Sequence, residues 1–353
     1  MGGIILINNS LKVAALFISA VIGAGFASGK EILTFFSQYD KASIYGLGLS
    51  GIVFFAFIYC LFRIIYLYKE KTDSFCDIFP AGVRVFYNIL SYILLFSMYS
   101  VMIAGLSSWG NILFGIKKSL FGLICTMIFI VLFVLGKNAL INSSLITTPV
   151  MCTGIIFTGI YYLLLSDKAV FNPFEKISHM WIISSLSYVS YNSIPLIALF
   201  WETKELFTSK EICFKGALFG CMSLSAISMV LDFLIKEFFV KVKVMDIPML
   251  YISERIGTFA HIISEVILML AMVSTALSSG FSLINILKRK SGLKPFAVIL
   301  TVCMGGFIMS VFGFSNLVEY IYPLLGYAGF VIIIYIIWIF LSKHSIKYDK
   351  NIK

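Results

Sequence analysis

The sequence predicts an all-α, polytopic membrane protein with about ten transmembrane helices. Of its 353 residues, 60% are hydrophobic and only 12% are charged, whereas a typical soluble domain carries about 25% charged residues. The apolar residues form successive runs that are separated by short loops, and the basic residues are concentrated in those loops. A water-soluble fold could not hide this much apolar surface, because the surface per residue falls only slowly with chain size.

Each predicted run is close to the roughly 20 residues that a helix needs to cross the hydrocarbon core. Together they predict one membrane domain over residues 1–353, with repeats at about 11–166 and 178–341 and a tail at 342–353. The stretch 237–257 has a mixed composition and predicts a short surface helix or cap. The ten runs are 11–38, 42–68, 83–114, 119–136, 140–166, 178–201, 211–236, 258–287, 295–315 and 317–341.

The positions of Lys and Arg predict the orientation, because cytoplasmic loops are enriched in both residues. If the N-terminus is inside, 17 of the 27 basic residues lie on the cytoplasmic side and 10 on the other side. This favours a multi-pass protein of a bacterial cell membrane with both termini in the cytoplasm. Topology therefore accounts for the net charge of +10, and we do not expect a nucleic-acid partner.

No motif for covalent chemistry is present. The seven cysteines form no CxxC pair and the three histidines form no HExxH motif, which are common patterns of metal or redox sites. The sequence also contains no ATP-binding motif and no evident nucleophile–base combination. We therefore expect neither an enzyme nor a bound cofactor, and the sequence leaves the oligomeric state open.

The first run is predicted to be broken by its glycines. Gly23, Gly25 and Gly29 lie within seven residues, and each glycine costs about 1 kcal/mol relative to alanine inside a helix. An alternative is a small-residue packing face, because Gly25 and Gly29 form a GxxxG pattern. A dinucleotide-binding loop is excluded, because the spacing is GxGxxxG and no strand precedes it.

The sixth run is predicted to be broken near Pro195. Proline removes a backbone donor and clashes with the preceding turn, and Asn192 is costly to expose to lipid. The alternative is a proline-kinked packing helix. The first and sixth runs each begin a set of five, and interrupted helices at matching positions are typical of the binding site of a secondary transporter.

The eighth run carries a group of hydroxyl side chains. Thr275, Ser278 and Ser279 have the i, i+3, i+4 spacing that places them on one helical face. Oxygen ligands of this kind suit a hard cation. The alternative is that each hydroxyl donates to a carbonyl one turn earlier in its own helix. In the same run, His261 and Glu265 could be a wet interfacial pair or a proton relay, and Asp232 in the preceding run is interpreted as interfacial.

Three segments resemble a known family. Residues 21–32 (VIGAGFASGKEI) are similar to the characteristic opening of the YkvI-like family of bacterial membrane proteins. Residues 188–192 (YVSYN) and 322–329 (YPLLGYAG) resemble later stretches of that family. The family is placed among the amino acid–polyamine–organocation (APC) transporters. The resemblance therefore implies the LeuT-like fold, a five-plus-five inverted repeat with discontinuous first and sixth helices.

The resemblance also implies a sodium site. Its carbonyl ligands would come from Ser19 and Ile22, and its hydroxyl ligands from the group on the eighth run (Thr275, Ser278 and Ser279). A second sodium site of some relatives uses an asparagine where this chain has Phe26, so the second ion is not supported. The run 140–166 lacks the lysine that replaces the ion in some proton-coupled relatives, which favours sodium.

The resemblance implies two possible functions for one pocket. The first is sodium-coupled symport of a small amino acid or a related zwitterionic or amine solute by alternating access. The second is a ligand-sensing receptor subunit, similar to germinant receptors, that binds without transport. The expected solute-binding residues are Gly23, Ala24, Gly25, Phe26, Ala27, Ser28, Gly29, Tyr188, Tyr191 and Asn192.

Overall fold

The computed structural model describes residues 2–165, 179–245, 247–312 and 326–342. Within these ranges every regular element is a helix. Seven helices are long and apolar enough to cross a membrane, and three shorter apolar helices accompany them at Asn9–Val21, Pro295–Ser310 and Gly326–Ser342. Within the described residues each of the ten predicted runs overlaps a helix, and the polytopic α-helical fold is confirmed.

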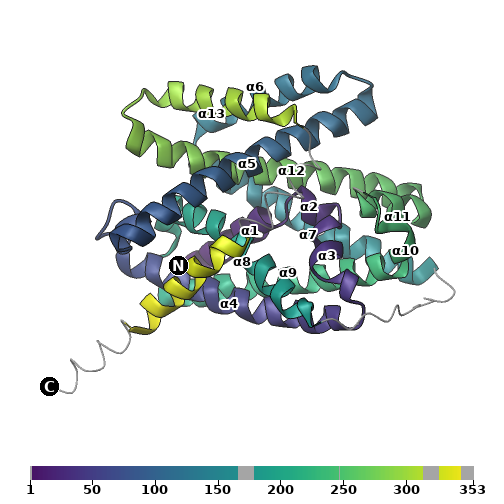
Figure 1. Cartoon of the computed structure of the whole chain (residues 1–353), viewed down its shortest axis with the longest axis horizontal. Helices are drawn as coiled ribbons and strands as arrows, with labels where there is room; N and C mark the ends of the chain where they lie inside the picture. The colour runs from purple at the N-terminus through teal and green to yellow at the C-terminus, as the bar shows by residue number, and fades with distance from the viewer. Residues whose placement is uncertain (1, 166–178, 246, 313–325, 343–353) are drawn as a thin grey trace.

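The observed boundaries lie within a few residues of the predicted ones for most of the long helices. The stretch 237–257 contains two short helices where the mixed composition predicted one short surface helix or cap. The elements in Figure 1 are α1 Gly2–Val21, α2 Ala24–Ala27, α3 Lys30–Phe35, α4 Ala42–Tyr68, α5 Ala81–Phe114, α6 Lys118–Leu135, α7 Lys137–Leu165, α8 Met180–Glu202, α9 Lys210–Glu237, α10 Phe239–Val242, α11 Pro248–Ile256, α12 Thr258–Ser291 and α13 Pro295–Ser310, with 3-10 turns η1 Ser37–Tyr39, η2 Phe75–Ile78 and η3 Lys204–Leu206.

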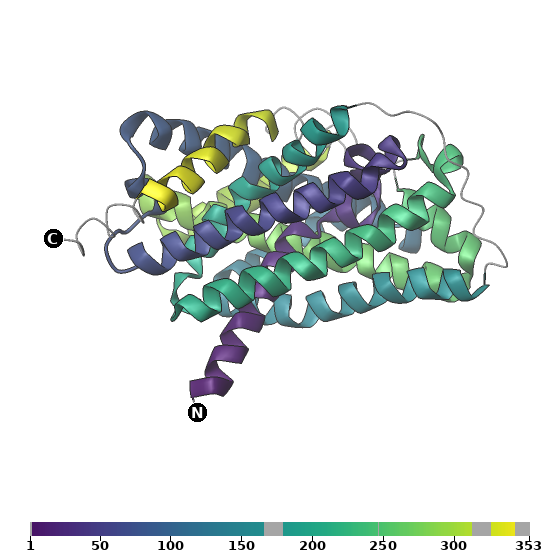
Figure 2. The ribbon, with the colours of Figure 1, turned by 90° about the horizontal axis from the view of Figure 1, so that it is seen from below.

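The helices pack as two groups around the site described below. The first group is formed by α1, α4, α8 and α9, which contact one another. The second group is formed by α5, α6, α12 and α13, and Figure 1 shows α6 and α13 side by side at its outer edge. Helix α7 contacts members of both groups. In Figure 2 the N-terminal part of α1 projects from the bundle, while its C-terminal end enters the middle.

The first predicted run is interrupted twice. Helix α1 ends at Val21, α2 is a single turn, and α3 begins at Lys30. Gly23 has an extended backbone (φ −91°, ψ −173°), and Gly29 has a φ of +79°, which side-chain-bearing residues rarely adopt. The glycine positions therefore coincide with the places where the helical path changes direction.

The predicted break in the sixth run is wrong. Helix α8 is continuous from Met180 to Glu202, with Pro195 inside it. Proline removes only one helical hydrogen bond, and this segment has no glycine to release further turns. The polar side chains close onto the helix itself: Asn192 Nδ2 donates to the Tyr188 carbonyl at 3.0 Å, and Ser193 Oγ donates to the Val189 carbonyl at 2.6 Å. The alternative of a proline-containing packing helix describes α8 better.

The division into two repeats stays a prediction. The junction between the predicted halves falls in 166–178, and most of the predicted tail falls in 343–353, both of which lie outside the described residues.

Candidate solute and ion site

The first interruption frees a carbonyl group in the middle of the bundle. In an unbroken helix, the Gly23 N–H would donate to the Ser19 carbonyl. It donates instead to the Val21 carbonyl at 2.8 Å, so the Ser19 carbonyl loses its helical partner. Buried carbonyls need another partner, and unwound backbone at membrane depth is tolerated only where protein or water supplies one.

Hydroxyl groups of α12 supply that partner. Ser274 Oγ donates to the Ser19 carbonyl at 3.2 Å, and Thr275 Oγ1 donates to the Ile22 carbonyl at 3.5 Å. Both distances exceed the usual 2.5–3.0 Å of an O–H···O hydrogen bond, and Ser274 Oγ also donates to the Ala271 carbonyl of its own helix at 3.0 Å. The two carbonyls implied by the resemblance therefore lie opposite neighbouring hydroxyls of α12, and all of these residues are buried.

The other two hydroxyls that were predicted as ion ligands follow the alternative interpretation. Ser278 Oγ donates to the Thr275 carbonyl at 3.1 Å, and Ser279 Oγ donates to the same carbonyl at 2.6 Å. They lie within about one turn of Thr275, but their hydrogen bonds are made to their own helix. Ser274, which the sequence analysis did not assign to the ion site, takes the position next to Ser19.

Helix α7 contributes a further pair of hydroxyls. Ser19 Oγ and Ser144 Oγ are 2.9 Å apart, and Thr148 Oγ1 donates to the Ala15 carbonyl at 2.9 Å. Sequence reasoning did not find these residues. The available signal was the pair of polar dipeptides at 143–144 and 147–148, one turn apart in an otherwise apolar run.

The second interruption is held by α11. Ser28 Oγ donates to the Gly25 carbonyl at 3.0 Å, and the Met249 N–H donates to the Ser28 carbonyl at 2.9 Å. Pro248 is the first residue of α11, so Met249 is in its first turn, where backbone N–H groups have no intrahelical partner. The surface helix therefore caps the break between α2 and α3. Lys30 Nζ also reaches this region and donates to the Met245 carbonyl at 3.0 Å.

The predicted opposite wall on α8 is present only in part. Tyr188 and Tyr191 are buried, and their rings contact Phe35 of α3, with centroid separations of 5.7 and 5.6 Å. Tyr188 also contacts Phe36 at 5.0 Å in an edge-on arrangement. Asn192 is buried, but its amide nitrogen donates to its own helix. The aromatic residues thus face the interrupted segment, and the role of Asn192 in binding a solute stays a prediction.

Glu31 is the acidic residue at the centre of this region, and sequence reasoning did not assign it to the site. Its side chain is 6% exposed and accepts a hydrogen bond from the Tyr191 hydroxyl. It bends back over α2: a Cβ added at Gly25 would lie 2.8 Å from Cγ and Cδ of Glu31. The absence of a side chain at Gly25 therefore provides the space that the carboxyl group occupies.

Glu31 has no basic partner among the described residues, whereas Asp232, another buried acid, does. Asp232 of α9 accepts from Ser37 and Ser43 at 2.7 Å each and pairs with Lys236 at 2.9 Å. Asp232 is 2% exposed, so it is buried among protein groups, and its interpretation as interfacial stays a prediction. The serines of the α3–α4 connection satisfy it inside the protein.

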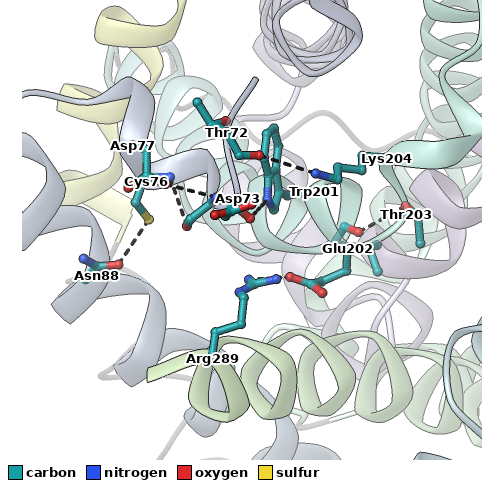
Figure 3. A network of polar contacts seen from close by, with 12 residues as sticks. Thr72, Asp73, Cys76, Asp77, Asn88, Trp201, Glu202, Thr203, Lys204 and Arg289 are labelled. Atoms are coloured by element: carbon teal, nitrogen blue, oxygen red, sulfur yellow. Dashed lines mark hydrogen bonds and ion pairs between the residues drawn. The ribbon is translucent and has the colours of Figure 1, made fainter. Parts of the chain in front are cut away.

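A polar network joins the C-terminal parts of α8 and α12 and the segment after α4 (Figure 3), on the side that the basic residues predict to be cytoplasmic. Glu202 at the end of α8 pairs with Arg289 of α12 at 2.6 Å, Trp201 Nε1 donates to the Asp73 carbonyl at 3.1 Å, and Lys204 Nζ approaches the Thr72 carbonyl at 3.5 Å. A cavity of about 440 Å³ is lined by Glu202, Arg289 and neighbouring residues. The network therefore ties α8 to α12 beside a polar cavity.

Cys76 belongs to the same network. Burial raises the pKa of its thiol above the ordinary value, with a smaller opposing contribution from the Ser74 hydroxyl. The thiol therefore stays protonated at neutral pH and can donate to Asn88 Oδ1, 3.2 Å from Sγ.

The His261–Glu265 pair lies apart from the site. His261 Nε2 is 3.4 Å from Glu265 Oε1, and both side chains are partly exposed. This agrees with the interfacial alternative. The described part of the chain contains no group of three or more His, Cys, Asp or Glu residues that could hold a metal ion.

Two bacterial proteins are similar to this chain in sequence. Membrane protein YkvI of Bacillus subtilis (strain 168) is 23% identical over 335 residues, which cover 92% of this chain and 94% of YkvI. Protein YyaD of the same organism is 24% identical over 355 residues, covering 94% and 98%. No protein-family model matches the chain.

Several solved structures share the fold. Mhp1, a nucleobase-cation-symport-1 family transporter in a closed conformation with bromovinylhydantoin bound, has a TM-score of 0.64 at 15% identity, over 93% of this chain and 77% of Mhp1. MhsT in complex with L-phenylalanine has a TM-score of 0.64 at 16% identity, over 94% and 87%. A Na+-coupled sialic acid symporter in a substrate-bound, outward-open state has a TM-score of 0.51 at 12% identity, over 91% and 83%.

Both sequence relatives match along nearly their whole length, and the structural likeness also extends over most of the chain. The protein is therefore a homologue of the Bacillus membrane protein YkvI and of the Bacillus protein YyaD, and it has the fold of the LeuT-like transporters.

Proposed function

We propose that the protein is a secondary active transporter of a bacterial cell membrane that moves a small amino acid or a related amine solute by alternating access. The observation that carries this proposal is the interrupted α1–α2–α3 segment in the middle of the bundle. Its Ser19 and Ile22 carbonyls face α12, and its second half faces the tyrosines of α8. Peptide groups that lack helical hydrogen bonds are energetically costly at this depth. In transporters, such groups bind the solute or the ion.

The packing supports a rocking motion of one group of helices against the other. Helices α1, α4, α8 and α9 contact one another, and α8 is joined to α12 at one end by the Glu202–Arg289 ion pair. Such an end contact can form and break as the site changes sides. The fold that this chain shares with Mhp1 and MhsT is compatible with the proposal.

We propose sodium as the coupling ion, bound between the Ser19 and Ile22 carbonyls and the Thr275 hydroxyl. Oxygen-only ligands suit a hard cation. Ser274 stands beside this position, and Ser278 and Ser279 lie close enough to join after rotation of their hydroxyls. One of the compared structures is a Na+-coupled symporter.

Uptake into sealed proteoliposomes tests the proposal. A mixture of radiolabelled L-amino acids is supplied outside, with an inward sodium gradient in one sample and an equal inward potassium gradient in its control. We expect accumulation that depends on the sodium gradient and is lost when an ionophore collapses it. Saturable binding of the same mixture without flux under either gradient would contradict the proposal and favour the receptor alternative.

A further inference from the structure

We propose that Glu31 binds the positively charged nitrogen of the solute. The protein therefore selects solutes that bear an ammonium group over carboxylic acids that lack one. This inference rests on the proposed function, because it concerns the same site. The inference is based on the position of the buried Glu31 carboxyl group. It accepts a hydrogen bond from a tyrosine hydroxyl and lies between the interrupted segment and a group of aromatic rings.

The first argument is that none of the described residues supplies a counter-charge to Glu31. A buried carboxylate requires a cation, a proton or several hydrogen bonds. Within the described residues Glu31 has only the Tyr191 hydroxyl, and the neighbouring Lys30 directs its ammonium group to the Met245 carbonyl instead. The structural acid Asp232 shows the contrasting arrangement, with Lys236 and two serine hydroxyls around it.

The second argument is the position of the carboxyl group. It covers Gly25, where a Cβ would collide with Cγ and Cδ of Glu31. The same turn, α2, contacts α12 and α3, and α3 contacts α8. Glu31 therefore occupies the place between the interrupted segment and α8 where a solute would meet both.

The third argument is the character of the walls. Phe35, Tyr188 and Tyr191 form mutual ring contacts with centroid separations of 5.6 to 5.9 Å. The faces of such rings attract cations within about 6 Å of the centroid. A carboxylate beside these rings attracts an ammonium group and repels a carboxylate, so the local chemistry discriminates by charge.

Thermal stabilisation of the purified protein by three matched series of compounds tests the inference without requiring transport. The first series is L-alanine, L-leucine and L-phenylalanine. The second contains the corresponding amines, which are ethylamine, isoamylamine and phenethylamine. The third contains the corresponding acids, which are propanoate, 4-methylpentanoate and 3-phenylpropanoate. We expect stabilisation by at least one member of the ammonium-bearing series and by none of the acids.

Variants then assign the effect to Glu31. We expect Glu31→Gln to weaken binding of the stabilising compound about 10- to 100-fold, as is typical for the loss of a charge-assisted hydrogen bond. Tyr191→Phe keeps the ring but removes the hydroxyl and should weaken binding less. Glu265→Gln is the matched control, because this glutamate is partly exposed and pairs with His261 away from the site.

Each remaining outcome overturns the inference. These are equal stabilisation by acids and amines, no stabilisation by any ammonium-bearing compound, and unchanged affinity in a folded Glu31→Gln protein. If Glu31→Gln does not fold, the comparison of amines with acids on the wild-type protein still tests whether the site selects ammonium-bearing solutes. Amine binding that depends on Glu31 but occurs without uptake would overturn the transporter proposal and leave this inference intact.

Discussion

Gly25 and Glu31 form a complementary pair at the residue scale. The carboxyl group of Glu31 occupies the volume that a side chain at position 25 would fill. Neither residue alone indicates this arrangement, because six positions separate them and the second interruption lies between them. A change at Gly25 should therefore act mainly on the site.

We expect Gly25→Ala to lower sodium-driven uptake at least about tenfold, because the added methyl group displaces the Glu31 carboxyl group and well-packed interiors tolerate extra volume poorly. Uptake of the labelled amino acid mixture and the melting temperature are measured together. Gly48→Ala is the control, since a Cβ there has no atom within 4 Å and alanine favours a helix by about 1 kcal/mol. Wild-type uptake by Gly25→Ala would contradict the assignment.

Among the proposed side-chain ligands of the ion, we expect Thr275 to contribute most to sodium binding, because its hydroxyl donates to the Ile22 carbonyl. We expect Thr275→Val, which keeps the shape and removes the hydroxyl, to raise the sodium concentration for half-maximal uptake at least tenfold, equivalent to about 1.4 kcal/mol. Thr301→Val is the control, because Thr301 is exposed on α13 and bonds to the Ala297 carbonyl of its own helix.

The double substitution Ser278→Ala and Ser279→Ala tests whether these hydroxyls coordinate the ion or only form hydrogen bonds within α12. Both hydroxyls donate to the Thr275 carbonyl, so we expect a smaller effect on sodium dependence than for Thr275→Val. Sodium dependence that is unchanged in Thr275→Val would remove the proposed ion site and leave the fold unaffected.

At the scale of elements, the Asp232–Lys236 pair fastens α9 to the connection between α3 and α4. Ser37 of η1 and Ser43 of α4 bind the carboxylate, and Lys236 also donates to Ser43 at 3.0 Å. All of these side chains are buried. The connection that follows the interrupted segment is therefore anchored to the helix group that includes α9.

We expect Lys236→Met to destabilise the protein by about 3–5 kcal/mol, because it leaves the Asp232 charge buried without its partner. Unfolding in mixed micelles measures the change, and the added substitution Asp232→Asn should recover part of it. Lys215→Met is the control: its pair with Glu211 has the same i, i+4 spacing but is exposed, and such pairs contribute at most about 1 kcal/mol. Equal losses for the two lysine variants would contradict this role.

At the scale of the whole molecule, the distribution of basic residues predicts both termini in the cytoplasm. A C-terminal fusion to green fluorescent protein should fluoresce, and a C-terminal fusion to alkaline phosphatase should be inactive. Alkaline phosphatase fused after residue 116, between α5 and α6, should be active because that loop is predicted to lie outside. The reverse pattern would overturn the orientation and the assignment of the Glu202–Arg289 network to the inner side.

The sequence by itself determined the polytopic α-helical class and the approximate limits of the long helices, because a membrane requires long apolar runs and these can be identified from residue composition. It also indicated the break at Gly23–Gly29, since clustered glycines are incompatible with one continuous helix. Only the tertiary structure decided the rest. Pro195 proved compatible with an unbroken α8, because Asn192 and Ser193 bond within that helix. The tyrosine that binds Glu31, the α12 hydroxyls beside the Ser19 and Ile22 carbonyls and the two serines that bind Asp232 lie on other elements, and contacts between distant segments depend on packing that no local pattern encodes.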